Sequence, residues 1–374
     1  MYLSGFLMAV HFASVSYVNS SLLQKYVGGS ALNVLYMAGS LLSIFFLFLA
    51  PTLSKKFGSV IAFLMFIAIE TAAVLSMGLF GAAVLVIMFF LLHIAADSAL
   101  YFCLDLSLEQ ETKIEGTTGR KRGLLLFFSN LAWVLTPLAV ALLVRGNDFS
   151  NVYLLSGFIL VPLFIIVGTF FQSTKQTRAH ESLRAALSSL RKVKDEAKII
   201  GSQLMLNFFF AWMVIYLPLL LNKTVGFGWD KIGVLFTIML LPFLIFQLPA
   251  GILSDKKIGE KELLTAGFII MAISTFAIPL ISGPIFWLWA LVLFATRIGA
   301  SLVEVASESY FFKHVKEEDS GLISLFRMAR PLSYVIAPLV AIPVVYFFSY
   351  SSSFYFLAIF TLLGLFFIPK VDTK

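Results

Sequence analysis

Apolar runs of about twenty residues recur along almost the whole chain, and they constrain its fold more than any other feature. A helix that crosses a bilayer needs roughly 20 mostly apolar residues. Twelve such runs are separated by short breaks of charged residues, glycine, proline, asparagine or serine. The sequence therefore predicts an all-α integral membrane protein with an up-and-down path. The twelve helices are expected at residues 2–22, 31–50, 59–77, 81–106, 122–144, 152–171, 199–221, 232–253, 263–281, 285–312, 322–348 and 353–369.

The composition excludes the main alternatives to a helical membrane protein. Of the 374 residues, 60% are hydrophobic and 13% are charged, whereas soluble domains average about 45–50% and about 25%. Transmembrane β-strands would need alternating polarity over about ten residues, and runs such as 41–49 show none. Cys103, the single cysteine, forms neither an internal disulfide nor a CxxC metal motif.

The basic residues predict the orientation of the helices. With both termini in the cytoplasm, the cytoplasmic segments hold most of the 27 Lys and Arg residues, and the external loops hold Lys25, Arg145, Lys223 and Lys231. This bias is the one expected of inner membrane proteins. It also explains the net charge of +7, so nucleic acid is not an expected partner.

One long polar stretch divides the chain into three predicted parts. Residues 1–171 form an N-terminal six-helix bundle, residues 172–198 a cytoplasmic linker, and residues 199–374 a C-terminal six-helix bundle. In the linker, leucines recur at helical spacing among Arg and Lys residues. This pattern predicts a basic amphipathic helix on the membrane surface, either a plain tether or a regulatory binding segment.

Corresponding positions in the two halves carry similar residues. Residues 53–58 read Leu-Ser-Lys-Lys-Phe-Gly, and residues 253–259 read Leu-Ser-Asp-Lys-Lys-Ile-Gly. The fifth and eleventh predicted helices each contain Pro-Leu, at Pro137 and Pro338. Two similar halves predict two pseudo-symmetric bundles related by an axis along the membrane normal.

These features resemble the major facilitator superfamily over the whole chain. The loop 251–261 is similar to the family motif after the second and eighth helices, although it has one inserted residue and Glu260 at a usually basic position. The resemblance implies that the first, fourth, seventh and tenth helices line a central cavity. It also implies that the loops control gating through Lys55, Lys56, Asp255, Lys256, Lys257 and Gly259.

Ionisable residues inside the predicted helices carry a high free-energy cost of burial in the bilayer, and they are functional candidates by default. Positions 93, 97, 101 and 105 share one face of the fourth helix. The hairpin register places the neutral Asn130 opposite Asp97, so this acid is suited to proton exchange, with His93 one turn away. We therefore expect Asp97, His93 and, on the tenth helix, Glu304 to be the proton-coupling candidates.

The same hairpin register predicts ion pairs that neutralise other charges. It pairs Glu308 with Arg327 and Glu304 with Arg330 between the tenth and eleventh helices. Between the fourth and fifth helices it pairs Asp105 with Arg122. Apart from Glu304, the residues of these three pairs are expected to have structural or gating roles. Glu70, on the third helix, has no predicted role.

A further set of residues is expected to line a substrate cavity. Arg297 lies mid-helix, and no acidic residue lies three or four positions from it. His11 can equally be a hydrogen-bonded packing residue. The full set of cavity candidates is Arg297, Tyr101, Ser301, His11, Asn207 and Trp212.

The sequence contains no phosphate loop, no HExxH and no serine nucleophile elbow. It therefore predicts no enzyme activity, cofactor or metal, and it excludes transport driven by ATP on this chain. The favoured function is a monomeric secondary transporter in the plasma membrane, coupled to protons or another ion and exporting a lipophilic compound. The alternatives are uptake or facilitated transport of a small organic anion and, in another class, a membrane-embedded enzyme or a scaffold.

Overall fold

The computed structural model describes residues 2–113, 118–172, 194–247, 249–251, 258–314 and 320–370. The predicted gating residues Asp255, Lys256 and Lys257 lie outside the described residues, as do residues 173–193 of the linker predicted at 172–198. The side chains of Asp105 and Arg122 also lie outside them.

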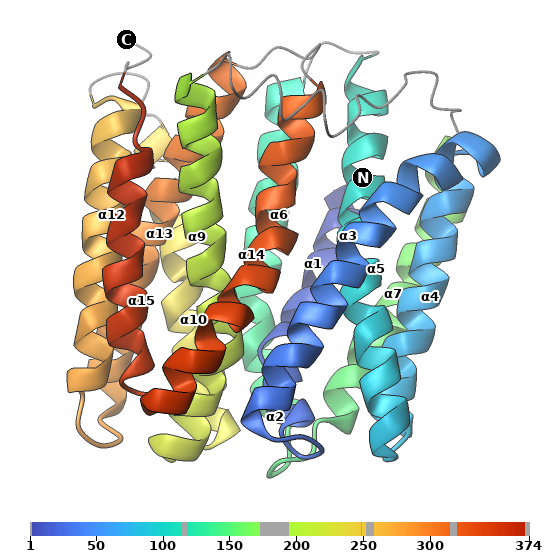
Figure 1. The fold of residues 1–374 in the computed structure, drawn as a ribbon. Helices are drawn as coiled ribbons and strands as arrows, with labels where there is room; N and C mark the ends of the chain where they lie inside the picture. The colour runs from blue at the N-terminus through green and yellow to red at the C-terminus, as the bar shows by residue number, and fades with distance from the viewer. Residues whose placement is uncertain are drawn as a thin grey trace. The chain divides into compact units, whose positions relative to one another are not determined.

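Helices make up nearly all of the described chain (Figure 1). The N-terminal half contains α1 (Tyr2–Ser16), α2 (Asn19–Leu23), α3 (Gly29–Phe57), α4 (Ser59–Leu79), α5 (Ala83–Lys113), α6 (Thr118–Leu143) and α7 (Ser150–Phe170). The C-terminal half contains α9 (Lys194–Leu219), α10 (Trp229–Ile245), α12 (Glu260–Ala277), α13 (Phe286–His314), α14 (Ser320–Phe347) and α15 (Ser353–Leu362). Short helical turns η1 (Leu220–Thr224), η2 (Ile278–Leu280) and η3 (Leu363–Phe367) extend α9, α12 and α15.

The prediction of a multi-helix membrane protein is confirmed. Within the described residues, 10 helical segments are long and apolar enough to cross a membrane, and Phe127–Leu143 and Ser353–Phe367 are shorter apolar helices. Each matches one predicted span. The first span differs in detail, because a turn at Tyr17 and Val18 separates α1 from α2. A helical backbone satisfies its own hydrogen bonds, as a segment in hydrocarbon must.

The contacts between Cα atoms divide the chain into two compact units. Unit 1 comprises Met1–Arg178 together with Gly228–Thr237, and unit 2 comprises Ala179–Phe227 together with Ile238–Lys374. The first part of α10 is therefore grouped with the N-terminal helices.

The two units repeat the same helix pairings. In unit 1, α1 packs against α6, and α4 packs against both α5 and α7. In unit 2, α9 packs against α14, and α12 packs against both α13 and α15. In each half these are the first with the fifth span, and the third with the fourth and sixth. The same pairings in both halves agree with the predicted arrangement of two pseudo-symmetric six-helix bundles.

Apolar side chains cover the outside of the helices as well as the inside. Large exposed residues such as Phe170, Trp287 and Phe366 are typical of surfaces that face lipid chains. Prolines also occur inside the helices, and α14 contains three of them, Pro331, Pro338 and Pro343. Membrane helices tolerate such prolines because neighbouring groups can satisfy the freed carbonyls.

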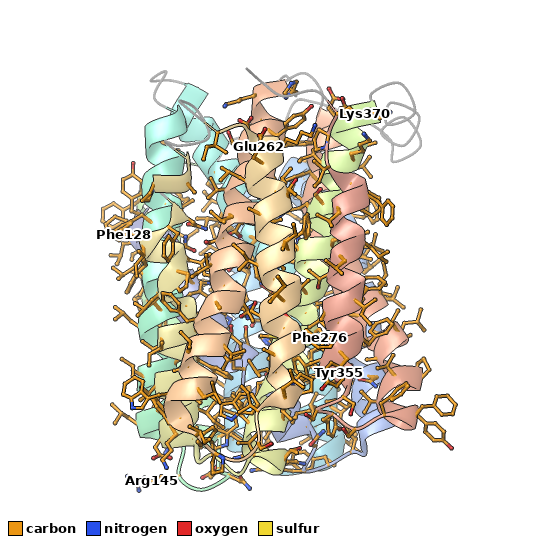
Figure 2. The ribbon with its side chains drawn as sticks, turned by 90° about the vertical axis from the view of Figure 1, so that its left-hand side faces the viewer. Phe128, Arg145, Glu262, Phe276, Tyr355 and Lys370 are labelled. Carbon is orange, nitrogen blue, oxygen red and sulfur yellow. The ribbon has the colours of Figure 1, made fainter. Side chains whose placement is uncertain are left out.

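Figure 2 shows the long axis of unit 2. Glu262 and Lys370 lie at one end of these helices, and Phe276 and Tyr355 lie toward the other. The rings of Phe276 on α12 and Tyr355 on α15 are 4.8 Å apart between centroids. This aromatic contact joins the two helices near that end.

Helices α12 and α13 approach each other closely at two glycines. A Cβ atom on Gly299 would lie 2.5 Å from the carbonyl oxygen of Gly267, and one on Gly267 would lie 2.8 Å from that of Gly299. Small residues let membrane helices bring their backbones together, so that dispersion contacts hold them in place of a hydrophobic effect.

This contact predicts that Gly299→Ala destabilises the protein. The new methyl group meets backbone rather than a flexible side chain, and overpacking of this kind costs about 1–3 kcal/mol. The matched control is Gly81→Ala, since a Cβ there has no atom within 4 Å. Thermal unfolding in detergent should show a lower midpoint for Gly299→Ala only. Equal midpoints for the two variants would contradict the tight glycine contact.

Candidate functional site

Three ionisable side chains meet inside unit 1. Glu70 of α4 lies between His11 of α1 and His93 of α5. Its Oε1 atom is 2.8 Å from His11 Nε2 and 2.5 Å from His93 Nδ1. The exposed fractions are 0% for His11, 0% for Glu70 and 2% for His93. One ligand atom from each residue lies within 4.8 Å of the others, so the three together could hold a metal ion.

On each imidazole, the ring nitrogen that faces away from Glu70 lies within hydrogen-bond distance of a neutral polar residue. The Ser156 hydroxyl lies 2.6 Å from His11 Nδ1, and the Asn19 amide nitrogen lies 3.2 Å from His93 Nε2. Tyr153 donates to Asn19 Oδ1 at 2.6 Å. Each imidazole is therefore bonded through both ring nitrogens. We call His11, Glu70 and His93, with Asn19, Tyr153 and Ser156 around them, the buried histidine cluster.

The helix pairings of unit 1 bring this cluster together. Glu70 and His93 lie at about equal distances along the chain from the turn at 80–82 between α4 and α5. Helix α7 packs against both α1 and α4 and carries Tyr153 and Ser156. The hairpin rule that paired other charges would also have found Glu70 with His93. No local pattern connects His11 to them, because α1 and α4 are distant in sequence.

The remaining predicted residues of α5 flank the cluster. Asp97 lies one helical turn from His93, and its charge acts on that imidazole. The Tyr101 ring stacks on Phe12 of α1 with 4.8 Å between centroids. His93, Asp97 and Tyr101 therefore follow one side of α5, as their spacing predicts.

In unit 2, Arg297 lies deep among aromatic side chains. It is 1% exposed, and its guanidinium carbon lies 5.1 Å from the ring centre of Phe209 and 5.4 Å from that of Phe210. Both rings belong to α9, which packs against α13. A cation over an aromatic face is stabilised by the quadrupole of the ring, most strongly where water is excluded.

The acids of unit 2 have different partners. Gln247 donates a hydrogen bond to Glu304 Oε2 at 2.6 Å. Arg327 Nη1 lies 3.1 Å from Glu308 Oε1, which is the ion pair that the hairpin register predicts. Lys313 Nζ lies 2.6 Å from Oε1 of Glu260, a fully buried acid at the start of α12 for which the sequence predicted no partner.

Other predicted residues make contacts within their own neighbourhood. Asn207 donates to the Gln203 carbonyl at 2.8 Å, and the Ser301 hydroxyl donates to the Ile298 carbonyl at 2.8 Å. Trp212 packs against Phe208, Tyr216 and Phe356. Lys55 and Lys56 lie in the last turn of α3, Gly259 precedes α12, and Arg330 lies on α14.

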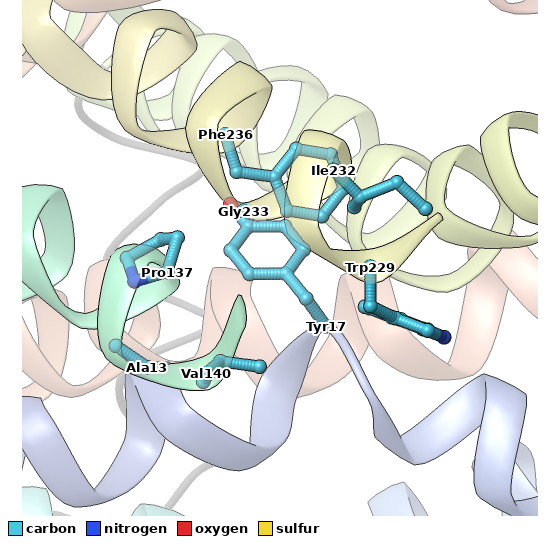
Figure 3. A pocket seen from close by; sticks show the side chains of 8 residues that line it. All are labelled: Ala13, Tyr17, Pro137, Val140, Trp229, Ile232, Gly233 and Phe236. Carbon is cyan, nitrogen blue, oxygen red and sulfur yellow. The ribbon is translucent and has the colours of Figure 1, made fainter. Parts of the chain in front are cut away.

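Unit 1 also contains a small, mostly apolar pocket where the start of α10 lies beside α1 and α6 (Figure 3). It is lined by Ala13, Tyr17, Pro137, Val140, Trp229, Ile232, Gly233 and Phe236. The approach is close because a Cβ on Gly233 would lie 2.4 Å from the Pro137 carbonyl oxygen. Thr237 adds a hydrogen bond to the Val134 carbonyl at 3.0 Å.

Comparison with known proteins gives one family match and a set of similar folds. Residues 200–374 match the family model described as Major Facilitator Superfamily. No curated protein sequence matches the chain.

Solved structures resemble the chain over nearly its whole length. They include the nucleoside transporter NupG, with 12% identity, a TM-score of 0.75 and coverage of 98% of this chain and 96% of that one. The POT family transporter PepTSo has 11% identity, a TM-score of 0.77 and coverage of 98% and 95%. A D-xylose-proton symporter has 16% identity, a TM-score of 0.75 and coverage of 99% and 95%.

The hydrogen bonds of the buried histidine cluster predict that Tyr153→Phe destabilises the protein by about 1–3 kcal/mol, because Asn19 Oδ1 loses its buried donor. The change removes one hydroxyl and no packing volume. Tyr355→Phe is the control, since Tyr355 is only partly buried. Denaturation in detergent should place Tyr153→Phe below wild type and Tyr355→Phe close to it. A Tyr153→Phe variant as stable as wild type would show that this bond contributes nothing.

Proposed function

We propose that this chain, whose residues 200–374 match the Major Facilitator Superfamily model and whose fold resembles that of solved transporters, is a secondary transporter that moves a small molecule by alternating access. One observation supports this proposal above the others. The fold matches transporters of nucleosides, peptides and a sugar over nearly the full length of each chain. A family and fold of transporters do not favour the enzyme or scaffold alternatives.

We propose Glu304 as the residue that couples transport to protons. It lies within α13, far from either end, and its acceptor bond comes from the neutral amide of Gln247. The hydrogen-bond donor at Glu304 is therefore uncharged, whereas Glu308 is paired with the guanidinium of Arg327. One of the structural relatives is a proton symporter. Asp97 and His93 of α5 are the other coupling candidates.

The substrate class has two candidates. The aromatic cluster around Trp212 and the low charge of the helices favour a lipophilic compound, which the protein would export. The buried guanidinium of Arg297 favours a small organic anion, because an anionic group could replace the aromatic faces as its partner. In either case the protein would act as a monomer in the plasma membrane.

The coupling role predicts a specific defect for Glu304→Gln in proteoliposomes. The amide keeps the shape of the side chain and can still accept the hydrogen bond from Gln247, but it cannot gain and release a proton. Accumulation driven by a pH gradient should therefore fall at least tenfold, while substrate exchange continues. Nucleosides, dipeptides, a pentose, organic anions and lipophilic cations form the substrate panel. Glu308→Gln is the control, because this acid is partly exposed, and it should retain accumulation.

The experiment distinguishes failure of the coupling assignment from failure of the transport proposal. If Glu304→Gln accumulates substrate as wild type does, Glu304 is not the coupling residue and Asp97→Asn is tested next. If wild type carries no solute of the panel with or without a gradient, the transport proposal itself fails.

The proposed orientation predicts which loops accept a membrane-impermeant thiol reagent. In a Cys103→Ser background, Arg145→Cys should be labelled from outside intact cells, because it lies in an external loop. Lys56→Cys should be labelled only after the membrane is opened. Labelling of Lys56→Cys in intact cells would reverse the assignment of both termini to the cytoplasm.

A further inference from the structure

The buried histidine cluster offers ligand atoms that could hold a metal ion. Two imidazole nitrogens and one carboxylate oxygen converge from α1, α4 and α5. The two short distances, 2.8 Å and 2.5 Å, both end on the same atom, Glu70 Oε1. The second carboxylate oxygen, Oε2, is buried and accepts no hydrogen bond from any residue that the structure describes.

One assignment of the imidazole protons leaves negative charge in the cluster. If Ser156 donates to His11 Nδ1 and Asn19 donates to His93 Nε2, both imidazoles are neutral and direct their N–H groups at Glu70. Glu70 then contributes one negative charge within the membrane. Such a charge is costly in hydrocarbon unless a cation balances it. A bound metal ion would supply that balance.

The ligand types select the kind of cation. Imidazole nitrogen with carboxylate oxygen suits zinc and neighbouring transition metals, whereas calcium and magnesium prefer sites built from oxygen alone. Glu70 Oε2 is available as a further ligand atom. The three side chains therefore fit an ion of the zinc type.

Each imidazole also has a hydrogen-bond partner on the side away from Glu70, as metal-binding histidines usually do. A histidine that binds metal through one nitrogen donates its other N–H to a carbonyl, carboxylate or hydroxyl, which fixes the ring. For His11 this partner would be the Ser156 hydroxyl or its carbonyl oxygen, at 2.6 Å and 3.4 Å. For His93 it would be the side-chain oxygen of Asn19 after the amide turns, and the Tyr153 hydroxyl, which now donates to that oxygen, would then accept from the amide nitrogen.

We propose that His11, Glu70 and His93 bind one divalent transition-metal ion of the zinc type, which ties α1, α4 and α5 together inside unit 1. Asn19 and Ser156 act as positioning residues for the two imidazoles. This proposal does not rest on the transport activity. It goes against the expectation from the sequence that the chain binds no metal.

The full-length protein in detergent tests this proposal with Zn²⁺ and Co²⁺ as probes. After removal of metal and dialysis against Zn²⁺, elemental analysis should find one zinc per chain, and Zn²⁺ should raise the thermal midpoint of the metal-free protein. Co²⁺ should give the visible absorption of a site with nitrogen and oxygen ligands. Neither wild-type measurement depends on a variant that folds.

Variants then locate the ion. Glu70→Gln and His93→Gln should lose the bound zinc, whereas His314→Gln, which changes a histidine at the end of α13, should keep it. Asn19→Ala should weaken zinc binding about 10–100-fold, as loss of support behind a ligand does. Wild-type protein that binds neither probe would overturn the proposal and leave a proton as the balancing cation. Equal zinc content in Glu70→Gln and wild type would also overturn it.

Discussion

Inside a bilayer no water is available to satisfy a polar group, and this constraint orders the whole molecule. Backbone groups meet it by forming helices. Side chains meet it in two ways that differ between the units. In unit 1 the ionisable groups lie against one another and against neutral hydrogen-bond partners, as Glu70 does with His11 and His93. In the described part of unit 2 the buried cation Arg297 lies against aromatic rings.

The two solutions have different chemical consequences. A hydrogen-bonded cluster specifies the position of each member, because both nitrogens of each imidazole have a partner and any displacement breaks a bond. A cation over rings is less directional, since the attraction comes from the whole ring face. Arg297 is therefore better suited to exchanging its partners than the histidines are. This difference favours a supporting role for the cluster and a ligand-binding role for Arg297.

Much of the fold follows from the sequence because apolar runs of the right length have one stable form in a bilayer. The predicted span at 59–77 corresponds to Ser59–Leu79, and that at 152–171 to Ser150–Phe170. The ion pair between Glu308 and Arg327 also follows, since adjacent antiparallel helices fix its register. The contact of His11 with Glu70 does not follow, because it depends on how helices distant in sequence pack. The partners of Arg297 depend on the same kind of packing.

The three prolines of α14 have a mechanical consequence. Each lacks an N–H, so the carbonyls four residues earlier, at Arg327, Tyr334 and Leu339, lose their usual helical donors. The axis of α14 can therefore bend at three points with fewer hydrogen bonds to break than in a helix without prolines. Its neighbour α9, to which Ser333 is bonded through the Leu204 carbonyl, has a single proline, Pro218 near its end. Helix α14 is therefore the more flexible member of the pair and α9 the stiffer one. A deformation of unit 2 would bend α14 before it bends α9.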